Sequence, residues 1–159
     1  MEFNGIPLHP LVVHAVVVFA PLAALSAVLY AAMPRWRWAL RWPLVATALI
    51  SVVTAYIATL SGADLAESRY GEALPPAVQA HEERGELLRN VLIAFTVAAG
   101  LAAWRLGGPS ALKSGRGERP TQSGAVDVLV TGLLVVGALA VVVLVFRAGD
   151  SGARNAWGV

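Results

Sequence analysis

Residues 128–146, VLVTGLLVVGALAVVVLVF, decide the fold, because this run contains no charged side chain. A helix needs roughly 20 predominantly apolar residues to cross the hydrocarbon core of a bilayer. The run, extended to 125–147, meets that requirement, and further segments do so at about 9–33, 42–62 and 87–105. The sequence therefore predicts an all-α integral membrane protein. We expect a four-helix bundle, antiparallel in up-down-up-down order, that forms one domain over 1–159.

The composition agrees with a membrane protein and limits the chemistry. Hydrophobic residues make up 57% of the 159 residues and charged residues only 14%, with a mean hydropathy of +0.67. A soluble domain is usually about 25% charged. The chain has no cysteine, which excludes disulfides, iron–sulfur clusters, covalently attached haem and thiolate metal sites. Any metal must be held by His, carboxylate or Met, and we expect a lipid bilayer and no nucleic acid as partner.

The charged residues outside the spans divide into a basic side and an acidic side. Loops 34–41 and 105–124 hold seven basic residues against only Glu118, with Asp127 at the start of the last span. The other segments hold five basic and eight acidic residues. Basic loops stay in the cytoplasm. We therefore expect both termini and the segment 63–86 to be extracytoplasmic. The seven basic residues are Arg35, Arg37, Arg41, Arg105, Lys113, Arg116 and Arg119.

Two features of the last span and the loop before it concern packing and mobility. Gly132 and Gly137 are spaced so that a neighbouring helix can come close, which also makes a homo-oligomer feasible. The stretch 107–124 is rich in Gly, Ser, Arg and Pro, and it predicts a mobile cytoplasmic loop without a core of its own.

All three histidines fall at the predicted extracytoplasmic end. His9 and His14 begin the first span, and His81 precedes the third. The topology brings Asp64 and Asp150 to the same end. His14 would lie about 6 Å inside a helix that begins near residue 10, deeper than the other four. An ionisable side chain inside a span is costly enough to indicate a function.

Three uses of these side chains remain open. His14 and His81 could hold haem iron between diagonally placed spans one and three. A set drawn from His9, His14, His81 and Asp64, with Asp150 as a possible addition, could instead bind zinc, copper or non-haem iron. Imidazoles could also handle protons. Within one regular helix His9 and His14 would point roughly 140° apart, so His9 would have to lie outside regular helix to join His14.

A structural interpretation stands beside these uses. His9 can be an exposed residue of the first turn, and His14 a polar residue bonded to a neighbouring helix. His81 begins the run HEERGE at 81–86, which is typical of a solvated amphipathic helix. In that case the His and Asp residues form a buried polar network in an accessory membrane subunit, at around 1 kcal/mol per hydrogen bond.

Both ends of the chain resemble a known family. The opening GIPLHPLVVH at 5–14 and the ending RAGDSGARNAWG at 147–158 resemble the bacterial membrane domain catalogued as domain-of-unknown-function family 2231. The intervening Ser61-Gly62-Ala63-Asp64 and His81 fall where that family tends to carry a polar turn and a histidine. The resemblance covers essentially the whole chain. One departure is Asp150, which stands where relatives often have a histidine.

The resemblance implies a compact four-span domain in the bacterial cytoplasmic membrane, without a settled activity. Relatives occur fused to Rieske-type or cytochrome c domains, which implies electron transfer on the extracytoplasmic side, with such a protein as redox partner. We therefore expect an electron carrier or accessory protein rather than an enzyme. In it His14, His81 and His9, supported by Asp64, would hold b-type haem or a metal ion.

Overall fold

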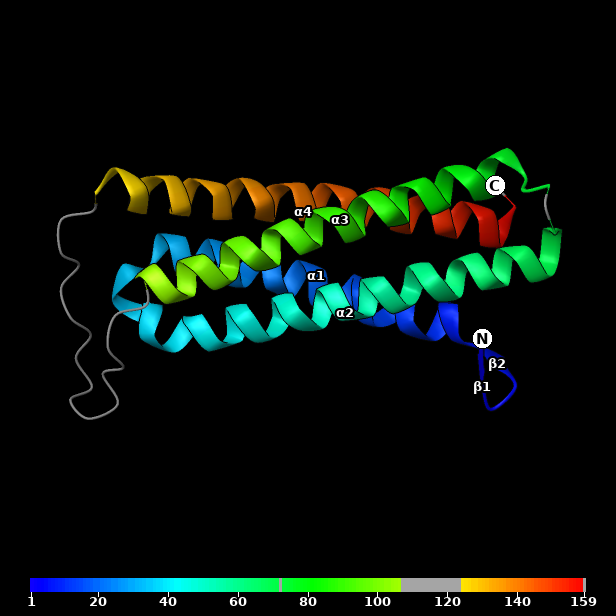
Figure 1. The fold of residues 1–159 in the computed structure, drawn as a ribbon, viewed down its shortest axis with the longest axis horizontal. Coiled ribbons are helices and arrows are strands. Elements are labelled where there is room, and N and C mark those ends of the chain that lie inside the picture. Colours follow the sequence, from blue (N-terminus) through cyan, green and yellow to red (C-terminus); the bar gives the residue numbers. More distant parts are fainter. Residues whose placement is uncertain (72, 107–123, 159) are drawn as a thin grey trace.

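Four long helices lie side by side in the computed structural model, which describes residues 1–71, 73–106 and 124–158 (Figure 1). Each is long and apolar enough to cross a membrane. The all-α, four-span architecture predicted from hydropathy is thus confirmed, with both termini at one end of the bundle (Figure 1). Most of the predicted mobile loop 107–124 lies outside the described residues. The helices are α1 (Leu8–Ala32), α2 (Arg37–Tyr70), α3 (Pro76–Leu106) and α4 (Ala125–Trp157), with a short 3-10 helix η1 (Pro34–Trp36) before α2.

Three of the helices extend well beyond the predicted spans, at the end of the bundle that carries the termini. The segment 63–86, expected to be a loop, is mostly helical, because α2 continues to Tyr70 and α3 begins at Pro76. Its residues include many good helix formers such as Ala, Leu, Glu and Arg. Gly71, with φ 61°, ends α2 in a conformation that favours glycine. The polar end of the molecule is therefore a helical bundle, which can hold side chains rigidly.

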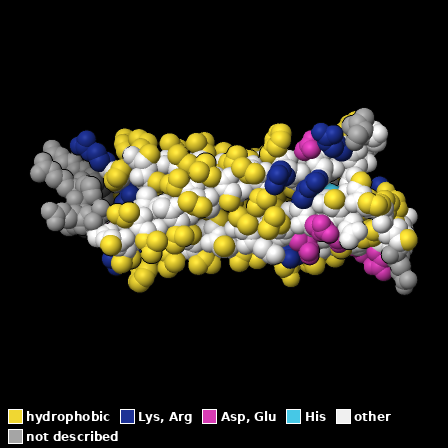
Figure 2. Space-filling model, turned by 90° about the horizontal axis from the view of Figure 1, so that it is seen from above, with side chains coloured by type: hydrophobic (Ala, Val, Ile, Leu, Met, Phe, Trp, Pro, Cys, Tyr) yellow, Lys and Arg dark blue, Asp and Glu magenta, His cyan; other side chains and the backbone are white. Residues whose placement is uncertain are grey.

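Small residues form much of the interface between the helices. α1 buries Ala20, Ala23, Ala24 and Ala27, each at most 2% exposed, and small residues let helix backbones approach closely in a membrane. α1 packs against α2 and α4, and α3 packs against the same two helices, so that α1 and α3 are diagonal partners. Many large hydrophobic side chains are exposed, and hydrophobic side chains are abundant along the middle of the face that Figure 2 shows, as a lipid environment requires.

The N-terminal residues form a small hairpin that the sequence did not predict. Strands β1 (Glu2–Phe3) and β2 (Ile6–Pro7) pair antiparallel. Asn4 and Gly5 make the turn with positive φ, as two-residue hairpin turns require. The hairpin returns the chain to the end of the bundle, where it leads directly into α1.

The two glycines of the last span have different surroundings, and this gives a prediction. A Cβ on Gly137 would lie 3.0 Å from the Phe95 ring, which is 2% exposed, whereas one on Gly132 would meet no atom within 4 Å. We expect Gly137→Val to lower the free energy of unfolding by about 1–3 kcal/mol through overpacking. Gly132→Val, the matched control, should change it by less than about 0.5 kcal/mol. Denaturation by sodium dodecyl sulfate in mixed micelles measures both, and equal effects would contradict this packing.

Candidate functional site

Two of the three histidines meet at the end of the bundle that carries the termini. His9 is on the first turn of α1 and His81 on the second turn of α3. Their ring centroids lie 6.1 Å apart, with the ring planes at 84°. Because α1 and α3 are diagonal partners, this imidazole pair bridges the bundle between α2 and α4. Both side chains are partly buried.

The hydrogen bond of His9 fixes which ring nitrogen carries the proton. His9 Nδ1 lies 2.8 Å from the carbonyl oxygen of Ala58 in α2. A carbonyl oxygen only accepts hydrogen bonds, so Nδ1 must be the donor. In the neutral ring Nε2 then keeps its lone pair, which is the form of imidazole that binds a metal ion.

His81 makes an equivalent contact with α4. Its Nδ1 lies 3.0 Å from the hydroxyl oxygen of Ser151, and this hydroxyl donates to the carbonyl oxygen of Ala148, also over 3.0 Å. Because the hydroxyl proton of Ser151 is donated to Ala148, the Ser151 oxygen must accept the hydrogen bond from His81 Nδ1. Both imidazoles of the pair are therefore held as Nδ1–H tautomers with Nε2 unprotonated.

Each ring of the pair also lies on a glycine of the next helix. A Cβ on Gly62 would lie 2.9 Å from His9 Nδ1, and a Cβ on Gly152 would lie 2.9 Å from His81 Cε1. In both cases the glycine belongs to a Ser-Gly-Ala tripeptide, at 61–63 in α2 and at 151–153 in α4. The two hairpins thus place a histidine in the same way. Sequence reasoning missed this equivalence, although the repeated tripeptide could have signalled it.

His14 does not join the imidazole pair. Its side chain is exposed, and its Nδ1 bonds to the carbonyl oxygen of Pro10 in the same helix. The reason is that α1 begins at Leu8, so His9 and His14 both lie in regular helix. They then point roughly 140° apart, and only one of them can face α3.

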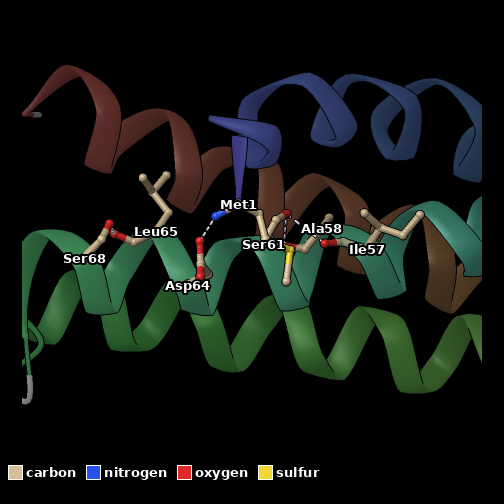
Figure 3. Close-up of polar contacts among 7 residues, drawn as sticks. All are labelled: Met1, Ile57, Ala58, Ser61, Asp64, Leu65 and Ser68. Carbon is tan, nitrogen blue, oxygen red and sulfur yellow. Dashed lines mark hydrogen bonds and ion pairs between the residues drawn. The ribbon is translucent and has the colours of Figure 1, made fainter. Parts of the chain in front are cut away.

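The two aspartates predicted to support the site have other partners. Asp64 is exposed and pairs with the amino nitrogen of Met1, which the N-terminal hairpin brings over α2 (Figure 3). Asp150 is also exposed and bonds to Arg154 one turn later, over 3.0 Å. Within 1–71, 73–106 and 124–158, no three His, Asp or Glu side chains gather in a way that would hold a metal ion. The site therefore consists of two imidazoles and their hydrogen-bond partners.

Comparison with known proteins agrees with this architecture. The family described as "Predicted membrane protein (DUF2231)" matches residues 5–159. The chain belongs to this family. The matched range includes both histidines of the imidazole pair and both Ser-Gly-Ala tripeptides. Neither the curated proteins nor the solved structures give a significant match. Membership of DUF2231 makes the chain a multi-pass membrane protein, in agreement with the four apolar helices.

In this DUF2231 protein the surroundings of His81 favour its neutral form. His81 precedes the apolar part of α3, and its partial burial lowers its pKa from the usual 6.5. The positive charges that His9 and Arg84 carry when protonated lower the pKa further, while a backbone hydrogen bond at Ala148 opposes the shift. Neutral imidazole is the form that can use Nε2 as a ligand.

The lowered pKa predicts how stability depends on pH in the metal-free protein. His81 binds a proton less readily in the folded than in the unfolded state. Its contribution to the stability of the fold is therefore complete above about pH 6.5, and it is lost as the pH falls through the pKa of His81 in the folded state. We expect the melting temperature to fall between pH 7.5 and 5, and to fall less in His81→Gln. His14→Gln removes one histidine outside the pair and serves as control. An unchanged pH dependence in His81→Gln would contradict the assignment.

Proposed function

We propose that His9 and His81 hold b-type haem or a metal ion through their Nε2 atoms, and that the protein is a membrane electron carrier. The observation that carries this proposal is the matched pair of Nδ1 hydrogen bonds, 2.8 and 3.0 Å long, which leave both Nε2 lone pairs free. Histidines that bind metals almost always donate their other ring N–H in this way, which fixes the tautomer and raises the basicity of the ligand.

The donor set and its spacing fit such a group. His9 and His81 would hold the group together, because their ring centroids lie 6.1 Å apart and a metal–imidazole bond is roughly 2.0–2.1 Å long. Haem could be held by these two side chains alone, so it would need no third side-chain ligand. A single metal ion would complete its coordination with water or a partner's side chain. The bound group would supply one-electron chemistry.

The protein's own contribution is to hold and adjust the two ligands. The Ala58 carbonyl and the Ser151 hydroxyl orient the rings, and the glycines at 62 and 152 leave room for the rings against α2 and α4. The lowered pKa of His81 keeps that ligand deprotonated.

The charge distribution supports a position on the extracytoplasmic side of a bacterial cytoplasmic membrane. Arg35 lies in η1, Arg37 and Arg41 lie at the start of α2, and Arg105 lies at the end of α3. All four are at the opposite end of the bundle from the imidazole pair. If basic residues mark the cytoplasm, the pair faces outward. There it would exchange electrons with a partner of the cytochrome c or Rieske type.

This orientation gives a testable prediction. A cysteine introduced at Ser114, which lies outside the described residues, should be unreachable in intact cells by an impermeant maleimide, because the basic end is cytoplasmic. Permeabilised cells provide the control for reactivity, since the same cysteine should then be labelled. Labelling in intact cells would invert the topology and place the imidazole pair in the cytoplasm.

An absorption spectrum of the detergent-purified protein tests the proposed function, with elemental analysis of the same sample. A Soret band, with sharp α and β bands after reduction by dithionite, would establish b-type haem. A colourless protein with about one zinc or copper per chain would establish a metal-ion site and remove the case for haem. Protein purified without chelators that contains neither would overturn the proposal.

A structural role is the second candidate, and the same contacts favour it. His9 connects α1 to α2, His81 connects α3 to α4, and the two rings contact each other across the bundle. Such hydrogen bonds stabilise helix packing in membranes by around 1 kcal/mol each. In that case the protein is an accessory membrane subunit, and its stability, rather than any bound group, depends on the two histidines.

A further inference from the structure

A polar pocket opens between α3 and α4, near the imidazole pair but separate from it. It has a volume of about 300 Å³ and is lined by Arg84, Phe146, Arg147 and Asp150. Phe146, Arg147 and Asp150 lie within one turn or so of α4, and Arg84 faces them from α3. All four side chains are exposed, so the pocket is accessible from the surroundings of the protein.

The pocket carries positive charge that no ion pair within the described part of the chain neutralises. Among the described residues neither Arg84 nor Arg147 forms an ion pair, whereas Arg89, Arg105 and Arg154 all do. The Asp150 carboxylate is bonded to Arg154 over 3.0 Å, so its charge is already compensated. Two guanidinium groups that line one pocket repel each other unless an anion lies between them. The arginine fork matches the oxygens of a phosphate group in particular.

The level of the pocket along the helices indicates where that phosphate comes from. Phe146 ends the apolar run of α4 and is 75% exposed, and Arg147 follows it directly. On α3, Arg84 precedes the exposed Leu87 by three residues. Basic side chains gather on this side of the molecule where the hydrophobic surface gives way to polar residues (Figure 2). In a bilayer this is the level of the lipid headgroups.

We propose that Arg84 and Arg147 form a binding site for the phosphate of an anionic phospholipid headgroup. The phosphodiester oxygens would accept hydrogen bonds from both guanidinium groups, and the Phe146 ring would lie beside the upper part of an acyl chain. Free inorganic phosphate shares the same chemistry and must be distinguished by experiment. The site does not depend on whether the imidazole pair binds a metal.

Native mass spectrometry of the full chain in detergent tests the site with two lipids, dioleoylphosphatidylglycerol and dioleoylphosphatidylcholine. We expect the wild type to prefer the anionic lipid, and Arg84→Gln and Arg147→Gln each to weaken its binding by about tenfold or more, the effect of one lost charge-assisted hydrogen bond. Arg69→Gln is the matched control. Arg69 is an exposed, unpaired arginine among the described residues at the same end of the bundle, in the last turn of α2.

A further variant and competition with inorganic phosphate show which group the pocket recognises. Arg147→Lys keeps the positive charge but loses the paired N–H donors of the guanidinium group. An affinity for the anionic lipid between those of the wild type and Arg147→Gln therefore supports recognition of a phosphate by paired hydrogen bonds. Displacement of the anionic lipid by millimolar inorganic phosphate would assign the pocket to free phosphate and overturn the lipid assignment. The site itself is wrong if the two lipids bind equally, or if the pocket variants behave like Arg69→Gln. Circular dichroism confirms that each variant retains its helices before the comparison is made.

Discussion

His81→Ala and His9→Ala are each expected to remove the bound haem or metal, whereas His14→Ala should retain it. Each imidazole of the pair supplies one of the two protein ligands. Losing one should therefore cost more than the roughly 10- to 100-fold in affinity that follows loss of an outer hydrogen-bond partner. His14 is exposed and bonds only within its own helix. The ratio of haem or metal to protein after purification measures all three variants.

A second substitution separates ligand loss from misfolding. His81→Gln keeps a polar side chain of similar length but has no imidazole nitrogen to bind a metal. We expect it to lose the bound group while its helical content matches that of the wild type. If His14→Ala loses the group and His81→Gln keeps it, the ligand assignment is wrong even if the protein binds a metal.

Gly62→Ala and Gly152→Ala are expected to have the next largest effects on metal binding. A Cβ at either position would lie 2.9 Å from an imidazole atom. Real Cβ contacts are essentially never this close, so the ring must shift. A ligand moved from its place should cost about 10- to 100-fold in metal affinity, as loss of an outer-shell partner does. Isothermal titration of the metal-free protein with Zn²⁺ as probe measures the change.

Gly149→Ala provides the matched control on the same helix. A Cβ at Gly149 would meet no atom within 4 Å, so the variant should bind Zn²⁺ like the wild type. Both alanine substitutions in α4 also raise the intrinsic helix propensity by the same amount. Equal affinities of Gly152→Ala and Gly149→Ala would show that the glycine at 152 does not position His81.

Hydropathy was sufficient to predict the four spans, because an uninterrupted apolar run such as 128–146 has no other stable location. The ends of the helices were harder to predict. Residues 63–70 of α2 and 76–86 of α3 are helical but polar, and a polar helix gives no hydropathy signal. The predicted loop 63–86 was therefore far longer than the segment that separates Tyr70, the last residue of α2, from Pro76, the first residue of α3.

The pairing of the histidines could be predicted only in part. The topology brought His9, His14 and His81 to one end, and the helical angle showed that His9 and His14 could not both face the same way. Which of the two faces inward depends on how α1 is rotated about its axis, and packing against α2 and α4 decides that. The partners at Ala58 and Ser151 follow from the same packing, so no spacing in the sequence specifies them.

Nuclear magnetic resonance of ¹⁵N-histidine-labelled protein in micelles tests the central claim most directly, with each signal assigned through a His→Gln variant. Before metal is added, we predict that His9 and His81 at pH 7.5 are Nδ1–H tautomers with Nε2 unprotonated. Addition of Zn²⁺ should shift the Nε2 resonances of His9 and His81 and leave that of His14 unchanged. Nε2–H tautomers in the pair, or a response to Zn²⁺ from His14 alone, would contradict the account.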